Sequence, residues 1–176
     1  MPGHGSHVIR VGMVKMSDAG NWLDRQTFST VIAATPLVSI DLIVRNSLGQ
    51  VLLGQRLNRP AAGFWFVPGG RILKQESLAQ AFYRLTLAEL GTPVAIEQAR
   101  FIGLFEHFYD DSVFGEQMTT HYVVNAFEMV LPDNSAQLPV LQHSAYRWLS
   151  ESELLDDAQV HLHSKWYFDS EKGYRT

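Results

Sequence analysis

Residues 69–91, GGRILKQESLAQAFYRLTLAELG, constrain the fold of this chain more than any other segment. Apolar residues recur at helical spacing from Ser77 to Leu90, and Gly91, with a proline two positions later, stops the pattern. A glycine pair stands before this helix, where glycine lets other groups approach the backbone closely. The segment therefore predicts a glycine-rich loop that leads into a helix, an arrangement suited to a phosphate-bearing ligand.

Strand-like segments outnumber helical segments in the rest of the chain. Strands are expected at residues 37–45, 51–57, 64–67, 101–109, 119–129 and 146–149, and helices at 24–34, from 150 onward and within 163–172. The turn signal NSLG joins the first two strands and predicts a hairpin. Because strands and helices do not alternate regularly, the expected fold class is α/β of the α+β kind, a mixed sheet with flanking helices.

The composition of the 176-residue chain favours a single globular domain, expected at residues 21–176 after a loose or tag-derived extension at 1–20. Hydrophobic residues make up 46% of the sequence, and the absence of cysteine excludes disulfides and thiolate catalysis. A net charge of −4 gives no basic surface for nucleic acid. Neither a spanning apolar run nor a secretory signal is found, so a cytoplasmic protein without a membrane partner is expected.

Glu89 is the carboxylate whose position in the predicted helix needs an explanation. At about 100° per residue it falls on the same stripe as Phe82 and Leu85, the face expected to be buried. A buried carboxylate is costly unless a partner compensates its charge. Three explanations stay open from the residues alone: Glu89 holds a metal ion, it forms a buried salt bridge, or the helix is twisted enough to expose it.

Five residues in this segment stand at positions that resemble the signature of the Nudix family. Gly70 is followed after five residues by Glu76, after seven more by Arg84, and then by Glu89 and Gly91. The family pattern is G-x5-E-x7-R-E-U-x-E-E-x-G-U, where U is an apolar residue. The resemblance implies the Nudix fold, in which Arg84 is expected to pair with Glu76 and pin the loop to the helix.

Two positions depart from that pattern. Leu85 stands where the family has the glutamate after the arginine, and Ala88 replaces the first of its paired glutamates, so Glu89 alone remains of the acidic cluster. This variant resembles the GDP-mannose mannosyl hydrolases, a Nudix subfamily. The likeness covers about residues 22–170 and includes TPLVSIDLIV, NRPAAGFWFVPGGR, HFYDD, TTHYVV and QHSAYRWL.

The resemblance implies a particular reaction. Most Nudix enzymes attack phosphorus and use several carboxylates, whereas the mannosyl hydrolases substitute at the anomeric carbon, with inversion, and release intact GDP. A nucleoside diphosphate is a good leaving group, so one divalent ion and arginines can stabilise the charge that develops on it. The implied function is Mg²⁺-dependent hydrolysis of GDP-mannose, with GDP-glucose as a further candidate substrate.

The resemblance also implies metal ligands and a base. It places one Mg²⁺ per subunit on the carbonyl of Gly69, the carboxylate of Glu89 and the amide of Gln142, all hard oxygen donors. His143 is the implied general base, because imidazole suits proton transfer near neutral pH. Since adjacent strand residues point to opposite faces, Gln142 and His143 can serve one site only if they lie in a loop.

Further residues are implied to contact the substrate. Arg56 and Arg71 would clamp the diphosphate, and Arg56 would thereby support catalysis. Asp41 interrupts the apolar run VSIDLIV and is implied to contact sugar hydroxyls or guanine, and to be a candidate for stabilising cationic character at the anomeric carbon. His107 and Tyr122 would contact the nucleotide or the sugar. Without the resemblance, Arg56 fits a surface salt bridge, and His107 and Tyr122 fit ordinary sheet positions.

An amino-terminal segment is implied to bind guanine. Its residues are Trp22, Leu23 and Phe28, which in the subfamily reach the base partly across a dimer interface, so a homodimer is implied. The residues alone also allow Phe28 and Val31 to be core positions of a short helix.

Two other functions remain open from the sequence. The first is an ordinary Nudix pyrophosphohydrolase that splits a nucleotide sugar at phosphorus, and the missing box glutamates speak against it. The second is a Nudix module that binds a nucleotide sugar without turnover. The retained Glu89, Gln142 and His143 speak against that module.

Overall fold

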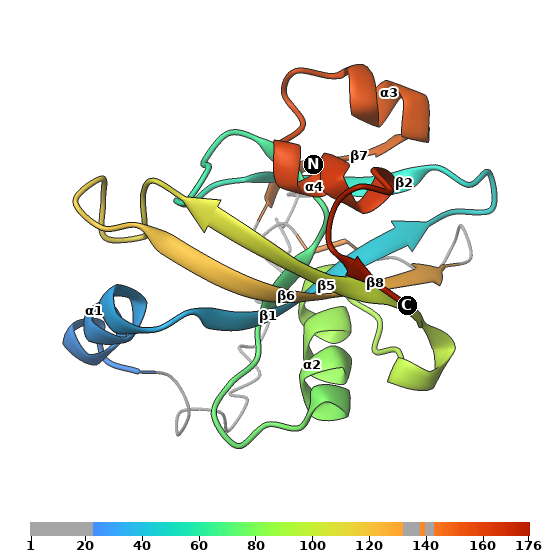
Figure 1. The fold of residues 1–176 in the computed structure, drawn as a ribbon. Helices are drawn as coiled ribbons and strands as arrows, with labels where there is room; N and C mark the ends of the chain where they lie inside the picture. The colour runs from blue at the N-terminus through green and yellow to red at the C-terminus, as the bar shows by residue number, and fades with distance from the viewer. Residues whose placement is uncertain (1–22, 132–137, 140–142) are drawn as a thin grey trace, which may run out of the picture.

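The computed structural model describes residues 23–131, 138, 139 and 143–176, so the expectation for residues 1–20 lies outside these ranges. One mixed eight-stranded sheet forms the centre, and the predicted α+β architecture is confirmed (Figure 1). The sheet runs β3-β2-β1-β6-β5-β8, with β4 paired to β1 and β7 paired to β2. The strands are β1 Leu37–Arg45, β2 Val51–Arg56, β3 Trp65–Phe66, β4 Gly69–Arg71, β5 Arg100–Tyr109, β6 Thr120–Val130, β7 His143–Leu149 and β8 Tyr174–Arg175.

Strand β1 organises the sheet because it pairs with β2, β4 and β6. It runs parallel to β6 along its whole length and antiparallel to the other two. The predicted hairpin is confirmed where Arg45 pairs with Val51, and Gly49 takes a φ of 76° in its turn. Asp41, in the middle of β1, is the register partner of Gly69 in β4. This pairing brings the glycine-rich segment against the strand that carries Asp41.

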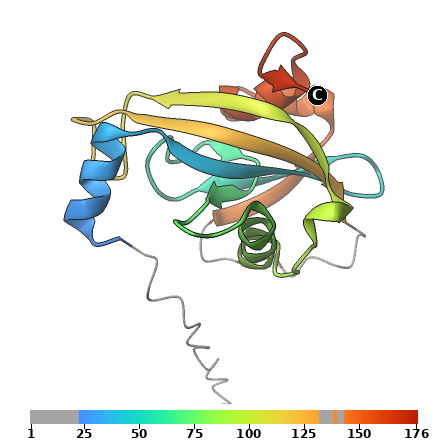
Figure 2. The same ribbon diagram turned by 60° about the horizontal axis from the view of Figure 1, so that its bottom comes forward.

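Helices cover both faces of the sheet (Figures 1 and 2). They are α1 Arg25–Ala34, α2 Leu78–Leu90, α3 Glu151–Asp156 and α4 Leu162–Lys165, with 3-10 turns η1 Ile96–Gln98 and η2 Trp166–Phe168. α2 begins after Ser77, whose hydroxyl accepts from the amide of Gln80 in a capping box, and ends at Gly91 in the left-handed conformation. Among the described residues, no helix is long and apolar enough to cross a membrane.

The apolar core divides between the two faces of β1, as the alternation of side chains along a strand requires. Leu42 packs with Phe82 of α2 on one face, and Ile43 packs with Tyr167 of η2 on the other. Fully burying a side chain such as Phe82 contributes about 1.5–3 kcal/mol, so these contacts hold α2 firmly to the sheet. Asp41 lies on the Ile43 face and therefore points toward the carboxy-terminal segment.

Three local expectations differ from the structure. β7 begins at His143, so this residue lies in a strand and not in the expected loop, while Gln142 lies outside the described residues. The carboxy-terminal segment is helical only through Phe168, and the short strand β8 follows. The sequence does not predict β4, because two glycines carry no side-chain pattern and main-chain pairing with β1 forms the strand.

Candidate active site

The glycine pair of β4 fits where no side chain could. A Cβ on Gly69 would lie 2.5 Å from the carbonyl oxygen of Ile40 and 2.6 Å from Oδ1 of Asp41. A Cβ on Gly70 would lie 2.6 Å from Cδ2 of Leu85 in α2. Gly69 therefore needs glycine, because backbone atoms block a Cβ there, whereas a Cβ on Gly70 would require the Leu85 side chain to move. The close approach places the Gly69 backbone beside the Asp41 carboxylate.

Arg84 pins the loop to α2, as the sequence predicts. Its Nε lies 2.6 Å from Oε1 of Glu76, and its Nη2 donates to Oε2 of Glu76 at 2.8 Å and to the carbonyl of Arg71 at 2.9 Å. Glu76 also accepts from the amide of Leu73. Burial opposes ionisation of Glu76, but the Arg84 hydrogen bonds prevail and hold its pKa below the usual value. The ion pair with Arg84 therefore explains the position of Glu76 without a metal ion.

Glu89 is buried on the inner face of α2, with 2% of its surface exposed, as its position on the apolar stripe predicts. Its Oε2 lies 3.0 Å from Nε2 of His143. The two residues predicted to bind metal and to act as base thus touch each other, although 54 positions separate them in sequence.

The imidazole of His143 rests against the backbone of Gly54. A Cβ on Gly54 would lie 2.5 Å from both Cγ and Nδ1 of the ring, so only glycine leaves room for it. A β-bulge between Gly54 and Arg56 shifts the register of β2, and His143 pairs with Arg56 beyond it. Nδ1 of His143 is buried and has no hydrogen-bond partner among the described residues.

Asp41 is held by a residue that the sequence did not single out. The hydroxyl of Tyr167 donates to its Oδ2 at 2.5 Å. Burial raises the pKa of Asp41 to about 6, although the Tyr167 hydrogen bond and the charge of Arg56 oppose that rise. The charge of Glu89 raises the same pKa further, so the two carboxylates lie close enough to interact. Asp41 therefore interacts both with Glu89, the predicted metal ligand, and with Arg56.

Arg56 supplies the positive charge at the centre of a polar cluster. Its guanidinium lies 4.9 Å from the ring centre of Phe66. Burial lowers the pKa of His107 to about 3, and the charge of Arg56 acts in the same direction. Burial raises the pKa of Tyr122, while Arg56 and Arg71 oppose that rise. Arg56 is thus surrounded by ionisable groups and is not an isolated surface arginine.

His107 and Tyr122 lie side by side, because they are register partners on β5 and β6. Directly paired residues of neighbouring strands leave the sheet on the same face. Tyr109 packs edge-on against Tyr122, with 6.1 Å between ring centres. Burial raises the pKa of Tyr109, and the charge of Arg56 partly opposes that rise. His107 and Tyr122, which are predicted to contact the substrate, therefore lie at one place on the sheet, and Tyr109 lies beside them.

Arg71 connects this cluster to the amino-terminal helix. Its guanidinium lies 4.0 Å from the ring centre of Phe28 in α1, within cation–π distance. Burial lowers the pKa of Arg71, and Tyr122 partly offsets this effect. Phe28 is half-buried, whereas the buried residue of α1 is Ile32. Leu23 is 47% exposed, and Trp22 lies outside the described residues.

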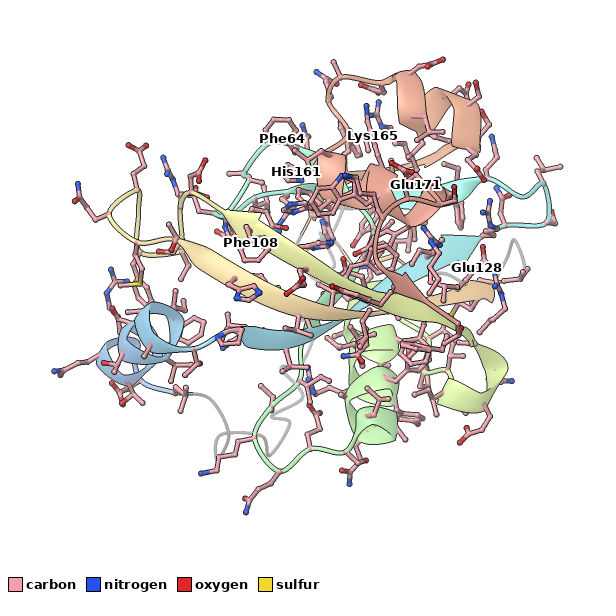
Figure 3. All side chains as sticks on the ribbon, viewed as in Figure 1. Phe64, Phe108, Glu128, His161, Lys165 and Glu171 are labelled. Atoms are coloured by element: carbon pink, nitrogen blue, oxygen red, sulfur yellow. The ribbon has the colours of Figure 1, made fainter. Side chains whose placement is uncertain are left out.

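The carboxy-terminal run HLHSKWYF adds two histidines that sequence reasoning missed. His161 stacks on Phe66 with 4.5 Å between ring centres, and it also contacts Phe64, beside which it lies in Figure 3. His163 stacks on His107 at 4.2 Å. The sequence signal for these histidines was their position a few residues before three consecutive aromatic residues. Because they lie far along the chain from the glycine-rich segment, the sequence did not connect them with the site.

Of the three predicted Mg²⁺ ligands, Gly69 and Glu89 lie within the described residues, and both offer oxygen donors that suit a hard divalent cation. Glu89 offers a buried carboxylate, and the Gly69 backbone lies beside Asp41, whose charge interacts with that of Glu89. Within the described ranges, no three His, Cys, Asp or Glu side chains are grouped so that they could hold a metal ion. A site built from one carboxylate, a backbone carbonyl and an amide needs no such group.

Known proteins share this architecture. A family model described as NUDIX domain matches residues 35–169. The Low-salt glycan biosynthesis protein Agl8 of Haloferax volcanii is 43% identical over 136 residues, which cover 73% of this chain and 85% of that protein. The MutT protein of Methanosarcina mazei superposes with a TM-score of 0.62 at 22% identity, over 76% of this chain and 91% of that chain.

A third comparison includes a metal ion. The bifunctional NMN adenylyltransferase/ADP ribose pyrophosphatase of Francisella tularensis, complexed with AMP and a manganese ion, superposes with a TM-score of 0.53 at 20% identity. The match covers 76% of this chain and 38% of that chain. Nudix hydrolases typically use divalent metal ions, which agrees with the donor atoms described above. From the extent of the family match and the identity to Agl8, this chain belongs to the Nudix hydrolase family.

Proposed function

We propose that the protein hydrolyses GDP-mannose to GDP and mannose by a Mg²⁺-dependent attack of water on the anomeric carbon, with inversion. The observation that carries this proposal is the inner face of α2. Leu85 is 4% exposed and packs in the core, Ala88 faces solvent, and Glu89 is the only acid in the helix. So few carboxylates suit displacement of a stable diphosphate from carbon better than attack at phosphorus.

The carboxylate of Glu89, the carbonyl of Gly69 and the amide of Gln142 would hold the Mg²⁺. When bound, the ion would neutralise charge that grows on the departing diphosphate. Arg56 and Arg71 would bind the remaining phosphate oxygens, since guanidinium groups match the geometry of phosphate oxygens and keep their charge. These interactions strengthen as the leaving group gains charge, and they therefore favour the transition state.

His143 would accept the proton of the attacking water. Its imidazole is buried and hydrogen-bonded to Glu89, which limits its rotation and holds it near the predicted metal ligand. A neutral imidazole can take up a proton near neutral pH, and such a base contributes about 10²–10⁴-fold in rate. Direct displacement by a single water inverts the configuration at the anomeric carbon.

The remaining predicted residues would orient the substrate. Asp41, His107 and Tyr122 would contact the sugar, because Arg56 interacts with all three and joins them to the diphosphate position. Phe28, with Leu23 and Trp22, would contact guanine, and a homodimer would complete that part of the site. The ring of Phe28 already packs on the guanidinium of Arg71.

The relative Agl8 supports a sugar-containing substrate, because its name assigns that protein to glycan biosynthesis. Nucleotide sugars are the activated donors from which glycans are assembled. GDP-glucose is the comparison substrate, since it differs from GDP-mannose only in the configuration of one hydroxyl-bearing carbon.

Hydrolysis of GDP-mannose with Mg²⁺ in ¹⁸O-labelled water tests the proposal. Mass spectrometry should find the label in free mannose and none in GDP, and NMR of fresh product should show β-mannose first. Label in a phosphate-containing product would establish an ordinary pyrophosphohydrolase. Tight Mg²⁺-dependent binding without turnover would establish a binding module.

A further inference from the structure

The hydroxyl of Tyr167 lies between two residues of the proposed sugar site. It is 2.5 Å from Oδ2 of Asp41 and 3.3 Å from Nε2 of His107. Tyr167 belongs to η2, far from both strands in sequence, and only 4% of its surface is exposed. The carboxy-terminal segment therefore supplies the group that joins β1 to β5 at this point.

The number of available protons determines the direction of each hydrogen bond. A tyrosine hydroxyl has a single proton to donate, and the short bond to the Asp41 carboxylate uses it. The contact with His107 must then be donated by the histidine, from Nε2–H to the tyrosine oxygen. In a neutral imidazole the other nitrogen carries no proton, so Nδ1 of His107 is left as an acceptor.

We propose that Tyr167 is a positioning residue that orients the Asp41 carboxylate and fixes His107 in the Nε2–H tautomer. The sugar then meets two hydrogen-bond acceptors, the carboxylate of Asp41 and Nδ1 of His107, and both suit hydroxyl donors. This role rests on the proposed function, because it assigns the sugar to this side of the site.

The surrounding packing holds the rings of Tyr167 and His107 in place without the hydroxyl. The ring of Tyr167 packs edge-on against Phe105 with 4.8 Å between ring centres, and His107 stacks on His163 at 4.2 Å. Tyr167→Phe therefore keeps the ring and removes only the two hydrogen bonds. Tyr174→Phe is a matched control, because Tyr174 lies in the same carboxy-terminal segment and is 73% exposed.

The tautomer can be measured without any turnover. Imidazole ¹⁵N shifts of the resting protein, assigned with His107→Gln, should show a protonated Nε2 and an unprotonated Nδ1 at His107. In Tyr167→Phe the two shifts should move toward each other, as the tautomers mix, whereas Tyr174→Phe should keep the wild-type values. A protonated Nδ1 at His107 in the wild type, or unchanged shifts in Tyr167→Phe, would overturn the proposal.

Kinetics on GDP-mannose provide the second test. Tyr167→Phe should lower kcat by about ten- to a hundredfold, the range found for outer partners that orient functional groups, while the affinity for GDP stays within twofold of wild type. Because Tyr167 acts through Asp41 and His107, adding Tyr167→Phe to the Asp41→Asn/His107→Gln variant should slow turnover no further.

The outcomes distinguish a failure of the positioning role of Tyr167 from a failure of the proposed hydrolysis of GDP-mannose. If Tyr167→Phe slows the Asp41→Asn/His107→Gln variant as much as it slows the wild type, Tyr167 does not act through these two residues and the positioning role is wrong. If wild-type protein fails to turn over GDP-mannose, the proposed function is wrong, and the ¹⁵N shifts still decide whether Tyr167 fixes the tautomer.

Discussion

Nε2 of His143 lies 3.0 Å from Oε2 of Glu89, so the residue assigned to accept a proton contacts the residue assigned to bind metal. Both side chains are buried. A substitution at either position therefore removes or changes a partner of the other. Glutamine is the appropriate replacement at both positions, because it keeps a polar side chain of similar length.

Glu89→Gln should weaken activation by Mg²⁺. An amide oxygen is a poorer ligand for a hard cation than a carboxylate, yet the amide can still hydrogen-bond His143. Outer-shell substitutions cost about 10–100-fold in metal affinity, so loss of a direct ligand should exceed about a hundredfold. Activity measured against Mg²⁺ concentration gives the shift directly. Unchanged activation in the variant would contradict the ligand assignment.

Glu76→Gln is the matched control for that experiment. Glu76 lies at the other end of the same segment but bonds Arg84, at 2.6 Å. Losing hydrogen bonds to a charged partner should lower the free energy of unfolding by about 1.5–3 kcal/mol. The concentration of Mg²⁺ that gives half-maximal activity should stay near the wild-type value. Urea denaturation and the same Mg²⁺ titration measure both quantities.

His143→Gln should reduce turnover of GDP-mannose by about 10²–10⁴-fold, the usual contribution of a general base. Affinity for GDP and Mg²⁺ should change little, because the base acts chiefly in the transition state. Single-turnover rates and calorimetric binding distinguish these effects. A variant within a few-fold of wild type would place the base elsewhere, with Asp41 and His107 as the next candidates.

Gly54→Ala should displace the His143 ring, since the new Cβ would lie 2.5 Å from its Cγ and Nδ1. Overpacking of this kind costs about 1–3 kcal/mol in stability, and turnover should fall with the loss of the base position. The same substitution in a His143→Ala background meets no ring and should cost much less stability. Equal costs in the two backgrounds would show that the contact is not responsible.

Acid should destabilise the protein through its buried histidines. Burial lowers the pKa of His107 to about 3 and of His163 to about 2, below the ordinary 6.5. Below about pH 6.5 these two histidines are therefore protonated in the unfolded chain but stay neutral in the folded protein. Stability is complete above that pH and falls on acidification by about 1.4 kcal/mol per pH unit for each histidine.

Urea denaturation at several pH values between 7.5 and 4.5 measures that slope. His163→Asn should make it shallower by one histidine's share, whatever its effect on stability at neutral pH. An equal slope in the His163 variant would mean that this residue is protonated in the folded state.

Local signals in the sequence predict most of the fold. Ser77 and Gly91 bound α2 as capping chemistry requires, and the β-rich run LVSIDLIVR predicts the bounds of β1. The strands β4 and β8 escape prediction, because they are two or three residues long and depend on pairing with distant strands. Tertiary context forms them, and no pattern within so short a run can report it.

The residues of the candidate site also fall into those that local patterns identify and those that depend on contacts between distant parts of the chain. Glu89 can be identified from its place on an apolar stripe, and Arg84 and Glu76 from their spacing. The contacts of Tyr167 with Asp41 and His107 join positions 126 and 60 residues apart, so no local pattern contains them. The requirement for glycine at position 54 is equally hidden, because it comes from a ring on another strand.

The contact between Leu85 and Gly70 also limits how this enzyme could evolve. Leu85 fills the space beside the glycine backbone and packs in the core with Phe82. A glutamate introduced at position 85 would bring a charge into apolar surroundings before any second metal ion could compensate it, which costs several kcal/mol. Regaining an acid there would require neighbouring side chains to change first. The interlock of side chain and backbone thus opposes a glutamate at position 85 unless other residues change with it.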